Sequence, residues 1–382
     1  MEHSKRKLAI IGASYLQVPL IEKAKAMNLE THVFAWLTGD PGEKLADYFY
    51  PISIVEKEAI LEQCQKIGIH GICSIASDLA TITVNYVAEK MGLIGNSLVC
   101  SHIATNKHAM RNAFEKNGDP SPKSYLVSSP ADLVGKPLLY PIIVKPLDRS
   151  GSRGITKLES PEGLDAAIDR AKSQGFLKCA LVEEFATGIE YSVECISWEG
   201  HHTFLAMTRK YTTGSPHFIE TGHIQPAPVD SCLLEKVKEI VFHALNSLQV
   251  RYGASHSEVK IREDGTVMII EIGARMGGDL IGSDLVKLST GVDFVKAVID
   301  IALGCAPAIP RGKQRAAGVR FVFGEPDIQV LKKLQAENPQ FLVRAVLEDT
   351  HEGIVEDSSM RFGYYLFSSE RIEDLIPYMP AH

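Results

Sequence analysis

The sequence predicts an α/β and α+β protein in three parts, and three observations lead to this prediction. Over residues 1–104, short apolar runs alternate with helical patterns, which is typical of a doubly wound parallel sheet. From about residue 105 to 305, strands follow one another with single helices between them, which indicates a different, central domain. The tail, residues 306–382, has strands of its own and is expected to form a small α/β domain.

The composition is that of a globular protein large enough to fold around its own core. The 382 residues carry a net charge of −7, which disfavours nucleic acids and anionic membranes as partners. No apolar run approaches the roughly 18 residues that a membrane helix needs. The seven cysteines are scattered, without a CxxC pair, so we expect neither a zinc ribbon nor a disulfide framework. A reducing cytoplasm is the simplest compartment.

The first part begins with a buried strand at residues 8–13, followed by a helix whose apolar residues recur every three or four positions. Further strands are expected at 31–36 and 68–76. Asp78 then suits the cap of a helix that ends before Gly92, because aspartate is favoured at helix starts and glycine just after helix ends. The opening IIGAS has a single glycine where a dinucleotide fingerprint has GxGxxG, which argues against a nicotinamide-dependent enzyme.

The central and C-terminal parts are expected to alternate strands with a few helices. A helix opened by Thr105 ends at Gly118, and a helix at 235–249 carries an apolar stripe along one side. The other expected helices span 160–173, 283–290 and 292–304. The expected strands span 140–146, 154–160, 181–185, 190–198, 256–262, 267–272, 316–324 and 361–367.

Two acidic residues are predicted to face each other across a hairpin. The strands 256–262 and 267–272 flank Asp264-Gly265, and Asp-Gly is the preferred centre of a two-residue type I′ turn. This turn places Glu258 opposite Glu271, with Cβ atoms about 5 Å apart on one face. The other face is then apolar and suited to a core; it consists of Val259, Ile261, Met268 and Ile270.

Two like charges at opposed positions need compensation. A hard divalent cation can supply it, since Mg²⁺ typically takes one or two carboxylates together with phosphate oxygens. Alternatively, Lys260 on the same face neutralises both glutamates in a structural ion pair. Both interpretations stay open at this point, and a longer turn would shift the register on which they depend.

A loop rich in glycine and serine follows Lys145. It lacks the GxxxxGK[ST] pattern of a P-loop, but a loop of this kind between two strands can fold over a polyphosphate. Its backbone N–H groups, hydroxyls and arginines would donate hydrogen bonds, and Lys145 would add a positive charge. The alternative is an ordinary hairpin loop with solvated charges. The residues concerned are Arg149, Ser150, Gly151, Ser152 and Gly154.

A connector between two expected strands is a second candidate for ligand binding. Its backbone groups can read an adenine edge, and its last acid can accept hydrogen bonds from ribose hydroxyls. Surface acids on strands are common, so a purely structural segment is the alternative. The residues concerned are Glu183, Glu184, Phe185, Ala186 and Glu190.

The glycine-rich segment 273–279 follows Glu271 directly. Arg275 within it could grip a phosphoryl group or a carboxylate through its planar fork, or it could simply pair with Asp279 or Asp284. The segment 209–228 is rich in loop-forming and polar residues, and we expect it to border the substrate pocket. The candidate substrate contacts are Arg209, His223, Arg275 and His256, the last because it neighbours Glu258.

Taken in order along the chain, these motifs resemble the ATP-grasp superfamily. The residues that carry the resemblance are Asn106-Lys107, Lys145-Pro146, the glycine–serine loop, the VEEF…GxEYSVE stretch, His256 to Lys260, and Glu271 to Arg275. Within the superfamily, the chain resembles in particular the carboxylate–amine (amino-acid) ligases related to the carbamoyl-phosphate synthase and phosphoribosylglycinamide synthetase group. The resemblance implies a pre-ATP-grasp domain at 1–104, an ATP-grasp domain at 105–305 whose two sheets enclose ATP, with a mobile lid at about 139–190, and a small C-terminal domain at 306–382.

The resemblance also implies roles for the matching positions. Lys107 and Lys145 would hold the ATP phosphates beneath the loop 149–154. Residues 183–186 would line the adenine, and Glu190 would take the ribose.

Metal and catalytic roles follow from the same resemblance. Glu258 and Glu271 would ligate Mg²⁺, or Mn²⁺ in its place, and Arg275 would lie near the γ-phosphate and the acyl group, with Lys145 as a second catalytic residue. Many members have an asparagine two residues after the second metal carboxylate, where this chain has Gly273. A third protein ligand to the metal is therefore in doubt.

The expected activity is that of an ATP-dependent ligase. It would convert a carboxylate into an acyl phosphate and join it to an amine, releasing ADP and phosphate. Small-molecule carboxylate and amine substrates are the expected partners, with a homodimer as the default assembly. Three alternatives remain: a bicarbonate-activating enzyme of the carboxylase type, an ATP-binding protein without catalysis, and an oxidoreductase built on the N-terminal domain.

Overall fold

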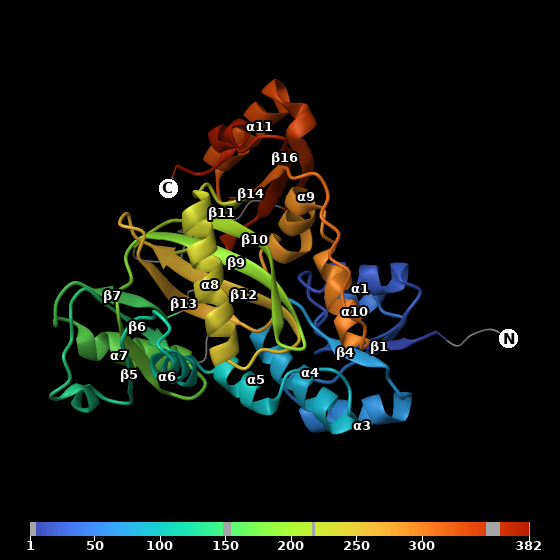
Figure 1. Cartoon of the computed structure of the whole chain (residues 1–382), viewed down its shortest axis with the longest axis horizontal. Coiled ribbons are helices and arrows are strands. Elements are labelled where there is room, and N and C mark those ends of the chain that lie inside the picture. The colour runs from blue at the N-terminus through green and yellow to red at the C-terminus, as the bar shows by residue number, and fades with distance from the viewer. Residues whose placement is uncertain (1–4, 148–153, 216–217, 349–359, 382) are drawn as a thin grey trace.

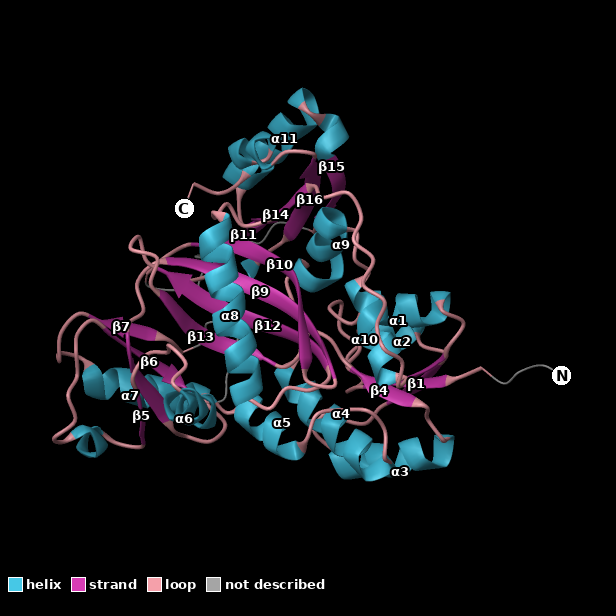
Figure 2. Cartoon of the chain, in the orientation of Figure 1, coloured by secondary structure: helices cyan, strands magenta, loops and turns pink. Residues whose placement is uncertain are grey.

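The structure is a computed structural model that describes residues 5–147, 154–215, 218–348 and 360–381 (Figure 1). Three sheets organise it, one parallel and two antiparallel, which confirms the mixed α/β and α+β class (Figure 2). The predicted loop residues Arg149, Ser150, Gly151 and Ser152 lie outside the described residues.

The N-terminal sheet is parallel, with the strand order β3-β2-β1-β4. Leu8 and Ile10 pack into one core cluster and Ala9 and Ile11 into another, so both faces of β1 are buried. A strand buried on both faces needs a continuous apolar run, which is the pattern the sequence shows here. The strands are β1 (Lys7–Ile11), β2 (Glu30–Phe34), β3 (Tyr48–Tyr50) and β4 (Gly71–Cys73); the helices are α1 (Val18–Ala26), α2 (Pro41–Leu45), α3 (Lys57–Ile67) and α4 (Asp78–Met91).

Two helices start one and two residues away from the predicted positions, and both starts place a site residue. Ser77 caps α4 by accepting a hydrogen bond from the backbone N–H of Ala80. Asp78, which the sequence suggested as the cap, is the first helical residue, and its carboxylate is free to pair elsewhere. Asn106 likewise caps the helix α6 (Lys107–Asn117), so that Lys107 opens it.

The large antiparallel sheet has eight strands in the order β13-β12-β9-β10-β11-β14-β16-β15. Helix α8 (Ser231–Ser247) lies across one face of it (Figure 1), and its residues Val237 and Val241 pack against Val193 and Val259 of the sheet. The strands are β9 (Ile189–Trp198), β10 (His201–Thr212), β11 (Glu220–Gln225), β12 (Gly253–Ile261), β13 (Val267–Gly273), β14 (Ala316–Val322), β15 (Leu342–Leu347) and β16 (Gly363–Ser369).

The small antiparallel sheet has the order β5-β8-β6-β7 and is covered by α7 (Leu164–Gln174). Its strands are β5 (Ser124–Val127), β6 (Ile142–Pro146), β7 (Thr156–Leu158) and β8 (Ala180–Glu184). The remaining α-helices are α5 (Leu98–Thr105), α9 (Val286–Thr290), α10 (Phe294–Ala302) and α11 (Glu325–Glu337). Short helical turns span Pro130–Leu133, Ile281–Leu285, Pro339–Phe341, Ile372–Asp374 and Ile376–Tyr378.

The C-terminal strands are continuous with the large sheet. Strand β14 pairs with β11 and β16 pairs with β14, so the tail extends the central sheet instead of forming a separate one. The domain boundaries near residues 104 and 305 stay predictions. None of the helices in the described ranges combines the length and the apolar character that crossing a membrane requires.

The β12–β13 hairpin pairs Glu258 with Glu271 as predicted, but its turn is not the predicted one. Its loop is one residue longer than a type I′ turn: the N–H of Gly265, at φ 76°, donates to the carbonyl of Arg262 (3.0 Å), and the strand pairing resumes at Thr266. A bulge at Ile270 then restores the register, because Val259 pairs with Ile269 while Glu258 pairs with Glu271.

The longer turn and the bulge also change which residues form the core. The predicted apolar face included Met268 and Ile270, but Val267 and Ile269 are the buried residues of β13. Because a one-residue shift turns every side chain to the other face, Ile270 instead lines the cavity described below.

Candidate active site

A cavity of about 330 Å³ lies where the three sheets meet, within the usual range for small-molecule sites. Residues from α4 to the segment just before β16 contribute polar groups to it. Its charged and ionisable lining residues are Asp78, Lys107, Arg111, Lys145, Glu183, Glu184, Glu190, Lys210, Glu220, His256, Glu258, Lys260, Glu271, Arg275, Asp279 and Arg361.

Lys145 is held by a buried carboxylate. Its Nζ lies 2.5 Å from Glu183 Oε2, and Arg111 Nε donates to Glu183 Oε1 at 2.9 Å. Burial alone would raise the pKa of Glu183, but the two cations hold it at about 2. Burial lowers the pKa of Lys145. Since both oxygens of Glu183 are occupied, this residue supports Lys145 rather than an adenine.

We expect Glu183→Gln to destabilise the protein by about 3 kcal/mol at pH 7, because it leaves two buried cations without their anion. The pKa of Glu183 is lowered on folding, so its contribution is present above pH 4.5 and is lost as the pH falls toward 2. In urea unfolding, the difference in the free energy of unfolding between the variant and wild type should therefore become smaller as the pH falls below 4.5. Glu159→Gln, at an exposed acid, is the control. A pH-independent difference would contradict this account.

Lys107 and Glu271 form an ion pair at the head of α6. The Lys107 Nζ lies 2.8 Å from Glu271 Oε1. Burial would lower the pKa of Lys107, but Glu271 and Asp78 raise it above its ordinary value. The bulge at Ile270 is what turns the Glu271 side chain toward this lysine and the cavity.

Lys210 sits at the centre of three carboxylates. Its Nζ lies 2.8 Å from Glu190, 2.6 Å from Glu220 and 2.7 Å from Glu258. Burial would lower the pKa of Lys210, but the three carboxylates raise it well above its ordinary value. The same lysine lowers the pKa of Glu258 despite that residue's burial.

His256 links Glu258 to a fully buried acid. Its Nδ1 lies 2.6 Å from Glu194 Oε1 and its Nε2 lies 3.4 Å from Glu258 Oε1. Burial would lower the pKa of His256, but Glu194 raises it to about 9. The imidazole is therefore cationic at neutral pH and adds a positive charge beside Glu258.

Arg275 pairs with Asp78, and not with Asp279 or Asp284 as one interpretation of the sequence had it. Its Nε and Nη2 donate to the two carboxylate oxygens at 2.9 and 3.1 Å. The planar fork of Arg275 is thus oriented by the first residue of α4. Asp279 and Asp284 pair instead with Arg361 and Arg344.

One side of the cavity is lined by apolar and aromatic groups. The rings of Phe185 and Phe218 are 5.9 Å apart, and Lys260 Nζ lies 5.0 Å from the Phe185 centroid. Glu184, Ala186 and Glu190 line the same cavity. Such a surface suits a planar ring with a polar edge. Of the predicted loop residues, Gly154 is described, at φ 69°, and it is not among the lining residues.

Two predicted substrate residues are not brought to the cavity. Successive side chains of a strand point to opposite faces, and on β10 it is Lys210 that faces the cavity, so the adjacent Arg209 cannot. Arg209 lies instead over the ring of Tyr211. His223 is fully buried and does not line the cavity, but its Nε2 faces the carboxylate of Glu220, which does line it. The segment 209–228 does reach the cavity, but through Lys210 and Glu220, and as strands β10 and β11 with their connection, not as a loop.

The carboxylates fit a hard divalent cation in their chemistry. Glu258 and Glu271 are opposed across the hairpin, and both line the cavity with oxygen donors. Each is balanced by a lysine, but the lysines are Lys210 and Lys107, and not Lys260 as the alternative required. Among described residues, Glu258 lies in a compact acidic group with Glu190 and Glu220, whereas Glu271 belongs to no such group.

The chain is similar in sequence and in fold to known ligases. The chain is 26% identical over 308 residues to an alanine–anticapsin ligase of Bacillus subtilis; the alignment covers 71% of this chain and 64% of that protein. This chain therefore spans somewhat less than two thirds of that relative's length. The structure of an L-amino acid ligase from Bacillus licheniformis matches with a TM-score of 0.84 at 23% identity, covering 98% of this chain and 96% of that one.

A third comparison involves a nucleotide complex. N5-carboxyaminoimidazole synthetase from Staphylococcus aureus, complexed with ADP, matches with a TM-score of 0.78 at 16% identity, covering 97% and 95% of the two chains. At these identities the two solved structures share the fold. The model of the ATP-grasp domain matches residues 138–284, which include Lys145, Glu183, Glu258 and Glu271. Over these residues the chain is similar to ATP-grasp domains, and over nearly its whole length it shares the fold of the solved L-amino acid ligase.

Proposed function

We propose that the protein is an ATP-dependent carboxylate–amine ligase. It would activate a carboxylate as an acyl phosphate and join it to an amine, releasing ADP and phosphate. The observation that carries this proposal is the joining, in one cavity, of three cations and two opposed carboxylates: Lys107, Lys145, Arg275, Glu258 and Glu271. The ligase names of the relatives support amino acids as substrates.

ATP would bind between the small and large sheets. Phe185 and Ala186 would contact the adenine, and Glu190 would accept hydrogen bonds from the ribose. Lys107 and Lys145 would meet the phosphates, since both ammonium groups line the cavity. The ADP complex of the structurally similar synthetase supports this nucleotide.

Glu258 and Glu271 would hold Mg²⁺, which, when bound, would neutralise charge on the terminal phosphates. Before binding, Lys210 and Lys107 lie beside these carboxylates and offset part of their negative charge. Lys107 would then pass from Glu271 toward a phosphate oxygen. Lys107 would thus offset a negative charge in both states, that of Glu271 without nucleotide and that of a phosphate with it.

The first chemical step transfers the γ-phosphoryl group. A carboxylate oxygen of the substrate attacks the γ-phosphorus, and the bond to the β–γ bridging oxygen breaks, which releases ADP. Arg275 is oriented by Asp78 to donate two hydrogen bonds to the group in transfer. In the second step the amine nitrogen attacks the acyl carbon, the carbon–oxygen bond to phosphate breaks, and the nitrogen loses a proton.

The test is a phosphate-release screen with ATP, Mg²⁺ and pairwise mixtures of amino acids and small carboxylic acids. We expect ADP and phosphate in equal amounts, and only when both an acid and an amine are present. Product mass should equal the two substrates less one water. ATP binding without turnover across the whole panel would refute the proposal.

Bicarbonate supplies the control that separates the two enzymatic interpretations. ADP release that depends on bicarbonate, without an amino acid, would assign the protein to carboxyphosphate chemistry instead. A homodimer and a cytoplasmic location stay predictions for sedimentation and localisation measurements.

A further inference from the structure

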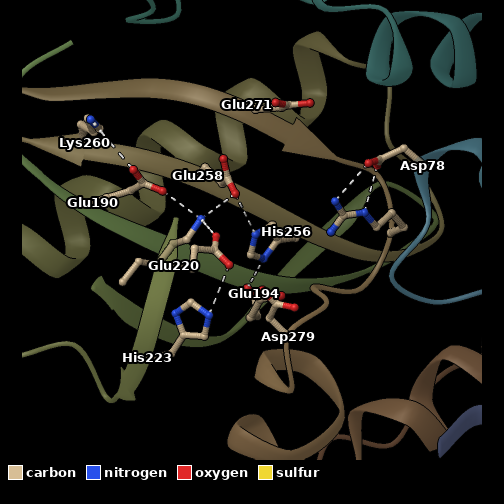
Figure 3. Close-up of polar contacts among 12 residues, drawn as sticks. Asp78, Glu190, Glu194, Glu220, His223, His256, Glu258, Lys260, Glu271 and Asp279 are labelled. Carbon is tan, nitrogen blue, oxygen red and sulfur yellow. Dashed lines mark hydrogen bonds and ion pairs between the residues drawn. The ribbon is translucent and has the colours of Figure 1, made fainter. Parts of the chain in front are cut away.

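We propose that Glu220 and Asp279 form the subsite for the amine substrate and bind it as an ammonium ion. This inference rests on the proposed function, because it names the place where the second substrate waits. Both carboxylates line the cavity, Glu220 from the start of β11 and Asp279 from the turn that follows β13 (Figure 3). Lys210 connects Glu220 to Glu258, so the subsite adjoins the proposed phosphoryl-transfer centre.

A buried histidine without hydrogen-bond partners points to a missing ligand. His223 is fully buried, and among described residues neither ring nitrogen has a hydrogen-bond partner. Its Nε2 is directed at Glu220 Oε2 from 3.6 Å (Figure 3). An unpaired buried polar group costs about 1–3 kcal/mol, which a bound donor would recover.

The backbone at Asp279 is strained. Asp279 and Leu280 have φ values of 49° and 66°, a region that side chains other than glycine rarely adopt. The turn is tightly packed as well, because a Cβ at Gly277 would lie 2.6 Å from His256 Nδ1. Strain of this kind persists where surrounding contacts fix a side chain in a required position, and here it directs Asp279 to the cavity.

The C-terminal segment fixes the same carboxylate. Arg361 Nη1 donates to Asp279 Oδ2 at 2.8 Å, and its Nη2 donates to the carbonyl of Glu220 at 3.1 Å. The guanidinium lies 3.8 Å from the centroid of Phe321, which holds it in place. Lys210 binds one oxygen of Glu220 and Arg361 binds one oxygen of Asp279. The second Glu220 oxygen lies 3.6 Å from both His223 Nε2 and Arg361 Nη2, outside hydrogen-bond distance, and can still accept a hydrogen bond from a ligand.

The number and spacing of acceptors suit a primary ammonium. One ligand atom each from Glu220, His223 and Asp279 lie within 4.8 Å of one another. A primary ammonium has three N–H donors, one for each acceptor. A divalent cation would meet twice the repulsion from Lys210 and Arg361, which already lie within 2.8 Å of the two carboxylates. The charges therefore favour a singly charged ligand.

The experiment compares two nucleophiles in the same protein. Hydroxylamine is neutral near pH 7.5 and traps an acyl phosphate as a hydroxamate, so it reports carboxylate activation without an ammonium ion. The second nucleophile is the amino acid with the highest turnover in the phosphate-release screen. For Asp279→Asn and Glu220→Gln, we expect the ratio of amide to hydroxamate formation to fall at least 30-fold. Asp169→Asn, at an exposed acid on α7, should keep the wild-type ratio.

A second experiment measures the inhibition of hydroxamate formation in the wild-type protein. The protonated amine should compete with hydroxylamine, whereas its N,N,N-trimethyl derivative, a cation without N–H donors, should inhibit at least 10-fold more weakly. Equal inhibition, or unchanged ratios in both variants, would overturn the subsite. A visible Co²⁺ absorption band that His223→Gln abolishes would assign the cluster to a metal and also overturn it. No hydroxamate from wild-type protein would instead refute the proposed function, and this inference with it.

Discussion

Replacing Glu271 by glutamine is expected to lower the rate of ADP formation about 10³-fold while the protein stays folded. The amide keeps the shape of the side chain but removes a full negative charge from the cavity. Lys107 then loses its partner at 2.8 Å, and the proposed cation loses one of two carboxylate ligands. Both effects weaken the neutralisation of the triphosphate at the moment of phosphoryl transfer. Steady-state kinetics at saturating ATP and Mg²⁺ measure the loss.

The control for this variant lies in the same hairpin. Glu263→Gln removes an identical charge from the exposed turn and should leave the kinetics within about twofold of wild type. Circular dichroism and a urea unfolding curve establish that both variants fold. Wild-type-like turnover of Glu271→Gln at limiting Mg²⁺ would remove Glu271 from the metal site and leave it as the partner of Lys107 alone.

The β12–β13 hairpin shows which features of a strand pairing can be predicted from the sequence and which cannot. The opposition of Glu258 and Glu271 could be predicted because register follows from a turn and a count of residues. The turn type was wrong, and the pairing survived because the bulge at Ile270 offset the extra loop residue. A bulge has no reliable signal in a single sequence, since it is decided by packing across the strands. The same bulge explains why Met268 and Ile270 were wrongly assigned to the core.

The cavity's ion pairs were beyond a single sequence for a different reason. Arg275 and Asp78 are 197 positions apart, and Arg361 comes from a tail with no visible motif. Lys210 was not predicted as a site residue, although its neighbour Arg209 was. The reason is that β10 was not predicted as a strand, so it was unknown which of its side chains share a face. A strand assigned over 201–212 would have placed alternate residues on one face and offered Lys210 as a candidate. Motif spacing found the residues near Glu258, and only the fold could find their partners.

Arg275→Lys is expected to lower kcat by 10²- to 10³-fold, with a smaller rise in the KM for ATP. Lysine keeps the positive charge but loses the planar fork, so it cannot hold Asp78 and donate to the transferring group together. The ground-state complex, which Lys107 and Lys145 also hold, should suffer less than the transition state. Initial rates over a range of ATP concentrations separate kcat from KM. A kcat within threefold of wild type would exclude Arg275 from the chemical step.

A variant of Asp78 tests whether this residue only positions Arg275 or also takes part in the reaction. Asp78→Asn keeps one acceptor for Arg275 but removes the charge that orients its fork, so we expect a loss of about 10-fold in kcat. If Asp78 acts only through Arg275, the double variant should be no slower than Arg275→Lys alone, because the interaction it would remove is already gone. Multiplied losses in the double variant would mean that Asp78 contacts the reacting groups itself. The cycle thus decides whether the N-terminal sheet merely supports the active site or forms part of it.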